Sequence, residues 1–256
     1  MNDAKHLIFG AHPVVEKLKA APSEVMEIMI ASAKRGGQGA RSVEALARSA
    51  GIVVNYVPAA VLDRFAAGHA HQGFVARVEP LSYRDVSELL RAVDSSPEDQ
   101  VLILDQLSDP RNFGALLRTA EAVGIRHVVI PKDRAVDVTP IVVKASAGAA
   151  HYLNIYKVTN LQRTMAELKE KGFWFTGLDP QAKTGLYDQI FPEKLGIVLG
   201  SEGTGIRPLI RRECDFLVSV PMRGRIASLN VAAAGAVVLY EVFRQKQKID
   251  KDKGKR

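Results

Sequence analysis

Glycines and small polar residues follow two apolar runs in the C-terminal third of the chain. Residues 200–205, Gly-Ser-Glu-Gly-Thr-Gly, come directly after the apolar run 197–199, and the arginine- and glycine-rich stretch 222–227 follows the apolar run 216–220. The tripeptide Ser-Leu-Asn, residues 228–230, then opens a long apolar helix. In an open α/β sheet, ligands bind where loops leave the carboxyl ends of the strands. The pattern therefore predicts that these loops form the floor of a cofactor site.

The order of the glycines excludes two familiar phosphate-binding signatures. A P-loop requires Lys-Ser or Lys-Thr after its last glycine, whereas Gly205 is followed by Ile206 and Arg207. The dinucleotide fingerprint requires G-x-G-x-x-G, whereas residues 200–205 read G-x-x-G-x-G. These residues alone leave a second interpretation open, in which the loop is a plain glycine turn between a strand and a helix.

The composition is that of a globular protein with one or two domains. The chain has 256 residues, of which 47% are hydrophobic and 25% are charged. No apolar run reaches the length of a membrane span, and the first residues lack the apolar core of a signal peptide. The single cysteine, Cys214, excludes an internal disulfide and fits a reducing compartment. We therefore expect a cytoplasmic protein without a membrane anchor.

Most of the net charge of +7 lies at the C-terminus. Residues 244–256 contain seven Lys or Arg and two Asp, a net charge of +5, which leaves only +2 for the rest of the chain. We expect residues 248–256 to form a disordered basic tail. The charge favours nucleic acid as a partner, although such a tail also serves as a solubilising end.

Changes in pattern divide the chain into segments. We predict a small α/β domain over residues 1–78, a polar linker over 79–99, and a larger α/β domain over 100–247, followed by the tail over 248–256. Apolar strands alternate with amphipathic helices in the larger domain, which predicts a mostly parallel sheet.

The small domain contains basic and histidine-containing loops but no catalytic constellation. Lys34, Arg35 and Arg41 lie in a glycine-rich stretch that predicts either phosphate contacts or a solvent-facing loop. His69 and the His71-Gln72-Gly73 tripeptide provide too few ligands for a metal site. The tripeptide precedes a predicted strand and is either a surface loop or a turn that contacts RNA.

Two predicted helices of the larger domain each have a face that does not pack on the domain's own core. Asp109 and Pro110 are typical of a helix start, and Arg111 and Arg118 fall together on the face away from the apolar stripe. They are either solvated arginines or cations that face a substrate or a second subunit. The predicted helix over residues 229–246 is apolar nearly all round at its start, which predicts a subunit interface on its second side.

Three stretches in a fixed order resemble a known set of motifs. Residues 109–120 contain Asp-Pro-Arg-Asn-Phe-Gly and Arg-Thr-Ala, residues 199–205 read Leu-Gly-Ser-Glu-Gly-Thr-Gly, and Val-Pro-Met at 220–222 is followed by Ser-Leu-Asn-Val at 228–231. Together they closely resemble the three motifs of the SpoU (TrmH-like) family of RNA ribose 2′-O-methyltransferases. Phe-Gly-Ala-His-Pro-Val at 9–14, with the His-Gln-Gly turn, resembles the substrate-binding domain of the RlmB-type members.

The resemblance implies a fold, a cofactor and a substrate. Family members have a C-terminal α/β domain with a deep trefoil knot, bind S-adenosylmethionine, need no metal and act as homodimers, and RlmB-type members methylate a guanosine ribose in the peptidyl-transferase region of 23S rRNA. By motif match the resemblance implies these catalytic positions: Asn112, Arg118, Glu202, Ser228 and Asn230. It implies these cofactor contacts: Ile197, Gly200, Val220, Met222 and Leu229. The predicted RNA contacts are Lys34, Arg35, Arg41 and Arg111.

Other functions share parts of this pattern. A tRNA or antibiotic-site rRNA ribose methyltransferase would carry the same three motifs. A non-catalytic RNA-binding protein would differ by failing to bind S-adenosylmethionine. A nucleotide-dependent oxidoreductase on a doubly wound sheet is disfavoured because the dinucleotide fingerprint is absent.

Overall fold

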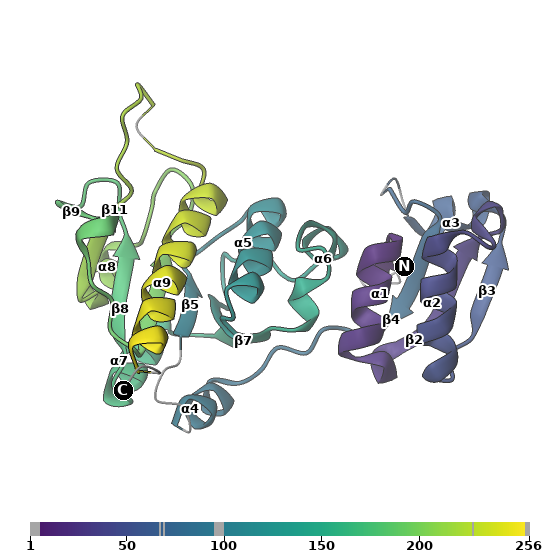
Figure 1. Cartoon of the computed structure of the whole chain (residues 1–256), viewed down its shortest axis with the longest axis horizontal. Coiled ribbons are helices and arrows are strands. Elements are labelled where there is room, and N and C mark those ends of the chain that lie inside the picture. The colour runs from purple at the N-terminus through teal and green to yellow at the C-terminus, as the bar shows by residue number, and fades with distance from the viewer. Residues whose placement is uncertain (1–5, 67, 69, 95–99, 227, 254–256) are drawn as a thin grey trace. The chain divides into compact units, whose positions relative to one another are not determined.

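The computed structural model covers the chain and describes residues 6–66, 68, 70–94, 100–226 and 228–253, with side chains described through residue 247. The chain forms two compact units. The N-terminal unit contains residues 1–82 and 137–152, and the catalytic-motif unit contains residues 83–136 and 153–256. Figure 1 labels most of the helices and strands of both units.

A four-stranded sheet of order β1-β4-β2-β3 forms the centre of the N-terminal unit. Strand β4 is antiparallel to β1 and β2, whereas β2 and β3 are parallel. The strands of this sheet are β1 (Leu7–Phe9), β2 (Val25–Ala31), β3 (Val54–Val57) and β4 (Phe74–Val78). The helical elements are α1 (Ala11–Ala20), η2 (Pro22–Glu24), η3 (Ser32–Lys34), α2 (Gln38–Ser49) and α3 (Ala59–Ala66).

Both faces of this small sheet are covered because its strands alternate their side chains. Ile28 and Ile30 of β2 pack with residues of α1 and α2, whereas Met29 and Ala31 pack with Leu62 of α3 on the opposite face. This alternation is the period of two expected for a strand. The sheet is therefore held between two layers of helix.

Residues 137–152 belong to the N-terminal unit although they follow β6 in sequence. This segment contains α6 (Pro140–Ala145) and η4 (Ala149–His151), and Val143 is buried in the same core as α1 and α2. The Tyr152 hydroxyl donates a hydrogen bond to Oε2 of Glu16 at 2.7 Å. The predicted boundaries at 78 and 100 placed the segment in the larger domain, and those boundaries stay a prediction.

The catalytic-motif unit is built on a seven-stranded sheet of order β7-β6-β5-β10-β8-β11-β9, in which every strand pairing is parallel. The predicted α/β class with a parallel C-terminal sheet is confirmed. The strands are β5 (Gln100–Leu104), β6 (His127–Pro131), β7 (Asn154–Val158), β8 (Trp174–Leu178), β9 (Thr184–Gly185), β10 (Leu195–Leu199) and β11 (Phe216–Ser219). The helices are α4 (Val86–Asp94), α5 (Pro110–Ala122), α7 (Leu161–Glu170), η5 (Leu186–Asp188), α8 (Pro208–Glu213) and α9 (Val231–Lys253). The order of strands does not by itself define a knot, and the trefoil knot stays a prediction.

Helices cover this larger sheet on both faces. Helices α4, α7 and α8 pack against side chains such as Ile103 and Val198 on one face, and α5 and α9 pack side by side on the other (Figure 1). A Cβ atom on Gly235 of α9 would lie 2.4 Å from Cδ2 of Leu116 and 2.8 Å from Cδ1 of Leu199. The missing side chain therefore lets α9 approach both α5 and the end of β10.

Helix α9 is longer than the sequence pattern predicts. It runs from Val231 to Lys253, whereas a disordered tail was predicted from residue 248. Lys, Gln and Arg are good helix formers, so the helix continues beyond its apolar part. Residues 254–256 lie outside the described residues. Within the described part of the chain, no helix is both long and apolar enough to cross a membrane.

Candidate active site

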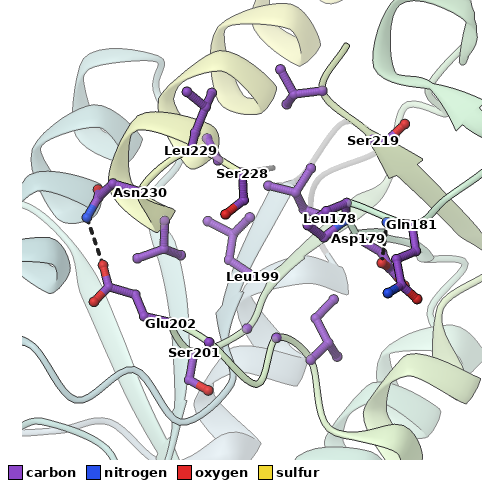
Figure 2. A pocket seen from close by; sticks show the side chains of 18 of the residues that line it. Leu178, Asp179, Gln181, Leu199, Ser201, Glu202, Ser219, Ser228, Leu229 and Asn230 are labelled. Atoms are coloured by element: carbon purple, nitrogen blue, oxygen red, sulfur yellow. Dashed lines mark hydrogen bonds between the residues drawn. The ribbon is translucent and has the colours of Figure 1, made fainter. Parts of the chain in front are cut away.

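The carboxyl ends of three neighbouring strands, β10, β8 and β11, surround a cavity of about 920 Å³ (Figure 2). Its walls come from residues 178–181 after β8, residues 199–206 at the end of β10, and residues 219–222 after β11. Residues 228–231 at the start of α9 complete it. The predicted site therefore lies where the parallel-sheet rule places it.

The glycine-rich loop is a closed turn that forms one wall of the cavity. The backbone N–H groups of Ser201 and Gly205 each donate to the other residue's carbonyl oxygen, at 3.1 and 3.0 Å. Gly203 and Gly205 have φ angles of 84° and 69°, in the region that glycine adopts most easily. A Cβ atom on Gly200 would lie 2.1 Å from the carbonyl carbon of Gly205. The two interpretations of this loop are thus compatible, because a tight glycine turn also lines the cavity.

A buried carboxylate anchors the end of this loop. Asp105, directly after β5, is fully buried and accepts hydrogen bonds from the backbone N–H of Arg207 at 2.9 Å and from its Nε at 2.7 Å. The Arg207 Nη2 atom lies 2.6 Å from Oδ1 of the same carboxylate. The Asp105 backbone N–H also donates to the carbonyl of Leu199 at 2.8 Å. Asp105 therefore ties the ends of β5 and β10 to the start of α8.

Three polar side chains from separate elements meet at the rim of the cavity. Nδ2 of Asn112 in α5 lies 2.5 Å from Oε1 of Glu202 in the glycine-rich loop. Nδ2 of Asn230 donates to the same Glu202 oxygen at 2.7 Å and to Oδ1 of Asn112 at 3.1 Å. Figure 2 shows Asn230 and Glu202 pointing toward each other beside Ser228. We call Asn112, Glu202 and Asn230 the rim network.

Helix ends hold the rim network in place. The Asp109 carboxylate accepts from the backbone N–H groups at the start of α5, which fixes the turn that contains Asn112. Asn230 plays the same part for α9, since its Oδ1 accepts from Ala232 N–H at 2.9 Å while its Nδ2 faces the network. The close packing at Gly235 brings the two helix starts together. Helix packing therefore positions both asparagines.

The structure gathers most, but not all, of the predicted C-terminal site residues. Seven of them line the cavity: Gly200, Glu202, Val220, Met222, Ser228, Leu229 and Asn230. Asn112 joins them through its hydrogen bonds to Glu202 and Asn230. Ile197 is fully buried earlier in β10 and does not line the cavity. Arg111 and Arg118 are exposed on α5, outside the cavity, and no ion pair is formed by either within the described residues. The roles of all these residues stay predictions.

The predicted RNA-contacting residues of the N-terminal unit do not lie in a loose loop. Lys34 ends η3, and a Cβ atom on Gly73 would lie 2.8 Å from its Cγ. The Arg35 guanidinium lies 4.4 Å above the ring centre of Tyr56. Arg41 is exposed on α2. Lys34 and Arg35 are therefore held by neighbours while their surfaces remain exposed.

Sequence reasoning missed the wall that follows β8. Asp179, Gln181 and Arg211 line the cavity, and Nε of Arg211 donates to Oδ2 of Asp179 at 2.7 Å. Burial alone would raise the pKa of Asp179, but hydrogen bonds from the Gln181 N–H and from Arg211 lower it overall. The signal was present, because Asp179 directly follows a predicted strand, as the other site loops do.

Comparisons with known proteins match almost the whole chain. Residues 99–240 match the SpoU rRNA methylase family, and residues 7–84 match the RNA 2′-O ribose methyltransferase substrate-binding domain. The chain belongs to the SpoU rRNA methylase family.

Two relatives are similar in sequence to this SpoU family member over nearly their whole length, and one solved structure is similar in fold. The 23S rRNA (guanosine-2′-O-)-methyltransferase RlmB of Escherichia coli K12 is 37% identical over 94% of this chain and 98% of its own length. YacO of Bacillus subtilis, named for the TrmH family of tRNA/rRNA methyltransferases, is 38% identical over 97% of this chain and 99% of its own length. The SpoU methyltransferase AviRb of Streptomyces viridochromogenes, solved with AdoMet, has a TM-score of 0.77 at 22% identity and covers 94% of this chain and 90% of its own. The AviRb likeness supports the fold.

Two further features bear on the chemistry of this SpoU family member. Among the residues that the structure describes, no group of three or more His, Cys, Asp or Glu side chains gathers in a way that could hold a metal ion. Burial raises the pKa of Cys214 to about 12, so the thiol is neutral and unsuited to act as a nucleophile. Cys214 does not line the cavity, whose polar side chains are carboxylates, amides, hydroxyls and the Arg211 guanidinium.

Proposed function

We propose that this chain transfers a methyl group from S-adenosylmethionine to the ribose 2′-hydroxyl of a guanosine in the peptidyl-transferase region of 23S rRNA. Family membership and the full-length similarity to E. coli RlmB support this substrate. The observation that carries the proposal is the rim network, which places two amides and a carboxylate at the mouth of a cofactor-sized cavity.

The cavity fits an adenosyl cofactor in size and in chemistry. Its volume of about 920 Å³ lies within the range of small-molecule sites. Leu199, Val220, Met222 and Leu229 provide apolar surface for a flat base. Polar groups such as Asp179 lie toward one side and Glu202 toward the other (Figure 2). The residues that would hold the cofactor are therefore the predicted ones, with the exception of Ile197, together with the wall after β8.

The cofactor, when bound, supplies an already activated methyl group, so neither a metal nor a covalent nucleophile is required. The protein must align a ribose hydroxyl with that methyl group and stabilise the negative charge that develops on the oxygen. Oε1 of Glu202 is held by both rim amides. Among the described residues no hydrogen bond is made to its second oxygen, which can therefore accept one from the ribose hydroxyl. Ser228, exposed beside the network, can donate to the same ribose.

A homodimer is part of this proposal. Arg118 lies outside the cavity of its own chain, yet the family motif includes this position. The exposed side of α9 carries Ala233 and Tyr240, the latter 52% exposed, and α9 packs on α5, the helix that bears the exposed Arg111 and Arg118. A second chain packed on α5 and α9 would cover this apolar surface and join the two copies beside their cavities.

The first test measures cofactor binding and methyl transfer separately. Calorimetry on EDTA-treated protein should show binding of S-adenosylmethionine without added metal. Mass spectrometry of a transcript of the 23S rRNA peptidyl-transferase region should then detect ribose 2′-O-methylguanosine. Asn112→Ala should reduce the methylation rate about 100-fold, as expected when a group that orients the reaction is lost.

A matched control is available in the same unit. Nε2 of Gln162 donates to Oε1 of Glu213 at 2.8 Å, an amide–carboxylate pair that does not line the cavity. Gln162→Ala should methylate RNA at the wild-type rate. Absence of cofactor binding would support the non-catalytic alternative. Methylation of tRNA but not of rRNA would support the alternative that the name of YacO also allows.

A further inference from the structure

An exposed glutamine in the N-terminal unit has a backbone conformation that is unusual for its type. Gln72 has a φ angle of 54°, and Gly73, which follows it, has a φ angle of 88°. A non-glycine residue in the left-handed region is uncommon and is kept only where its surroundings fix it. The side chain of Gln72 is exposed to solvent. Its Oε1 lies beside the start of α1, where a Cβ atom on Gly10 would be 3.4 Å away.

The residues around Gln72 hold this turn rigidly. Nε2 of His71 lies 2.9 Å from Oδ1 of Asp63, and Nδ1 accepts a hydrogen bond from the Gly73 N–H at 3.0 Å. The carbonyl of Gly73 accepts from the N–H of Ala31 in β2 at 2.8 Å. The histidine therefore serves the turn itself, and among the described residues the Gln72 amide forms no hydrogen bond.

Two lysines flank the turn. The aliphatic part of Lys34 packs over Gly73, where a Cβ atom would lie 2.8 Å from Cγ and 3.2 Å from Cε of the lysine. Nζ of Lys144 in α6 donates to the carbonyl of Ala70 at 2.8 Å. Both lysines are exposed, and within the described residues neither forms an ion pair with a carboxylate. Two exposed lysine side chains thus contact the backbone on either side of Gln72, one at Ala70 and the other at Gly73.

We infer that Gln72 reads a base of the substrate RNA while Lys34 and Lys144 contact neighbouring phosphates. This inference rests on the proposed rRNA substrate. A glutamine amide carries both a donor and an acceptor and can pair with two groups on one base edge. Proteins read RNA sequence mostly in unpaired loops, whose base edges are accessible. The match of residues 7–84 to an RNA ribose methyltransferase substrate-binding domain favours RNA as the ligand.

The test compares two RNAs and separates base recognition from phosphate contact. One is a transcript of the 23S rRNA peptidyl-transferase region, and the other has the same length and helices but shuffled loop bases. Gln72→Gly removes the amide yet keeps a backbone suited to a positive φ, so folding is preserved. It should lower the preference for the first RNA about tenfold, the discrimination that one two-bond base contact provides. Gln72→Asn should retain part of the preference, because asparagine keeps the amide and tolerates this conformation.

The lysine variants provide the contrasting result. Lys34→Ala and Lys144→Ala should weaken binding of both RNAs equally and should each lower the salt dependence of binding by about one ion. An unchanged RNA preference in Gln72→Gly would overturn the inference, as would a wild-type protein that binds both RNAs equally well. Methylation of the transcript by the wild-type protein is scored independently. If the wild-type protein methylates the transcript but Gln72→Gly keeps the wild-type RNA preference, the proposed function stands and this inference fails. If the wild-type protein does not methylate the transcript but Gln72→Gly loses the preference, the proposed function fails and this inference stands.

Discussion

Arg118 has to act as a fixed cation if the proposed reaction is correct. A guanidinium stays protonated in proteins and presents a planar fork of donors, so it suits an alkoxide and a phosphate better than it suits proton removal. Arg118→Ala should lower the rate of methyl transfer at least 100-fold in single-turnover assays. The affinity for S-adenosylmethionine should be nearly unchanged, because Arg118 does not line the cavity.

Arg118→Lys distinguishes a cation from a base. A lysine keeps the charge but not the fork, so it should restore part of the rate without changing the shape of the pH–rate profile. If the variant is active only after its amine loses a proton, then position 118 removes a proton and the assignment is wrong.

His151 predicts how the stability of the N-terminal unit depends on pH. Burial, and then the charge of Lys17, lower the pKa of His151 from 6.5 to about 3, and both ring nitrogens are buried without a hydrogen-bond partner among the described residues. The unfolded chain therefore binds a proton below about pH 6.5 that the folded unit does not. The free energy of unfolding is therefore highest above pH 6.5 and decreases as the pH falls from 6.5 toward 3.

The melting temperature of this unit should fall between pH 7 and pH 5, and His151→Phe should show a shallower fall because the ionisable group is gone. His12 is exposed, so His12→Phe serves as a control and should keep the wild-type slope. Equal slopes in wild type and His151→Phe would contradict the buried, neutral imidazole.

Among the secondary-structure elements, the sequence pattern predicted the strands and the long helices but not the short helices. Continuous apolar runs predicted strands such as β5 and β6, because a strand covered on both faces is apolar at every position. The six-residue helices α6 and α8 were missed, since fewer than two turns give no measurable period. The packing of residues 137–152 on the N-terminal unit was also beyond reach, because the sequence does not state which core a short helix joins.

The anchor between β5 and α8 gives a prediction at this scale. Asp105→Asn replaces a fully buried carboxylate that Arg207 contacts through its backbone and its guanidinium. We expect the free energy of unfolding to fall by about 1–3 kcal/mol, because the buried hydrogen bonds to Arg207 are weakened. The loss should not be larger, because the Arg207 side chain can turn toward water and so does not become a buried, unpaired charge. The affinity for S-adenosylmethionine should fall about tenfold, a loss of about 1.4 kcal/mol, because the released loop lines the cavity.

Asp94 provides the matched control for this change. Its carboxylate pairs with Lys171 at 2.7 Å on the surface, where an ion pair contributes at most about 1 kcal/mol. Asp94→Asn should therefore leave cofactor affinity unchanged in calorimetry. Wild-type affinity in Asp105→Asn would show that the loop keeps its shape without the anchor.

The whole molecule explains why the site was only partly predictable. Each member of the rim network was recognisable by its motif, but the bonds join residues 90 and 118 positions apart. Only the folded chain, with α9 packed closely on α5, shows that the Glu202 carboxylate is shared by two amides. Periodicity likewise gives the direction of strands but not the threading of the chain, so the knot rested on the resemblance alone.

Assembly is the remaining property of the whole molecule, and α9 makes it testable. The start of this helix is apolar nearly all round, yet Ala233 is exposed within one chain. Light scattering should give the mass of a dimer for the wild-type protein at micromolar concentration. Ala233→Arg places a charge in the proposed interface, where an unpaired charge is costly to bury, and should shift the protein to the mass of a monomer.

Ala166 allows a control substitution of the same kind outside the proposed interface. It is exposed on α7, a helix that covers the opposite face of the sheet from α9. Ala166→Arg should therefore remain dimeric. If Arg118 serves a site completed by the second chain, Ala233→Arg should also lose methyl transfer, whereas Ala166→Arg should retain it. A monomeric wild-type protein, or a monomeric Ala233→Arg variant with full activity, would show that one chain suffices for catalysis.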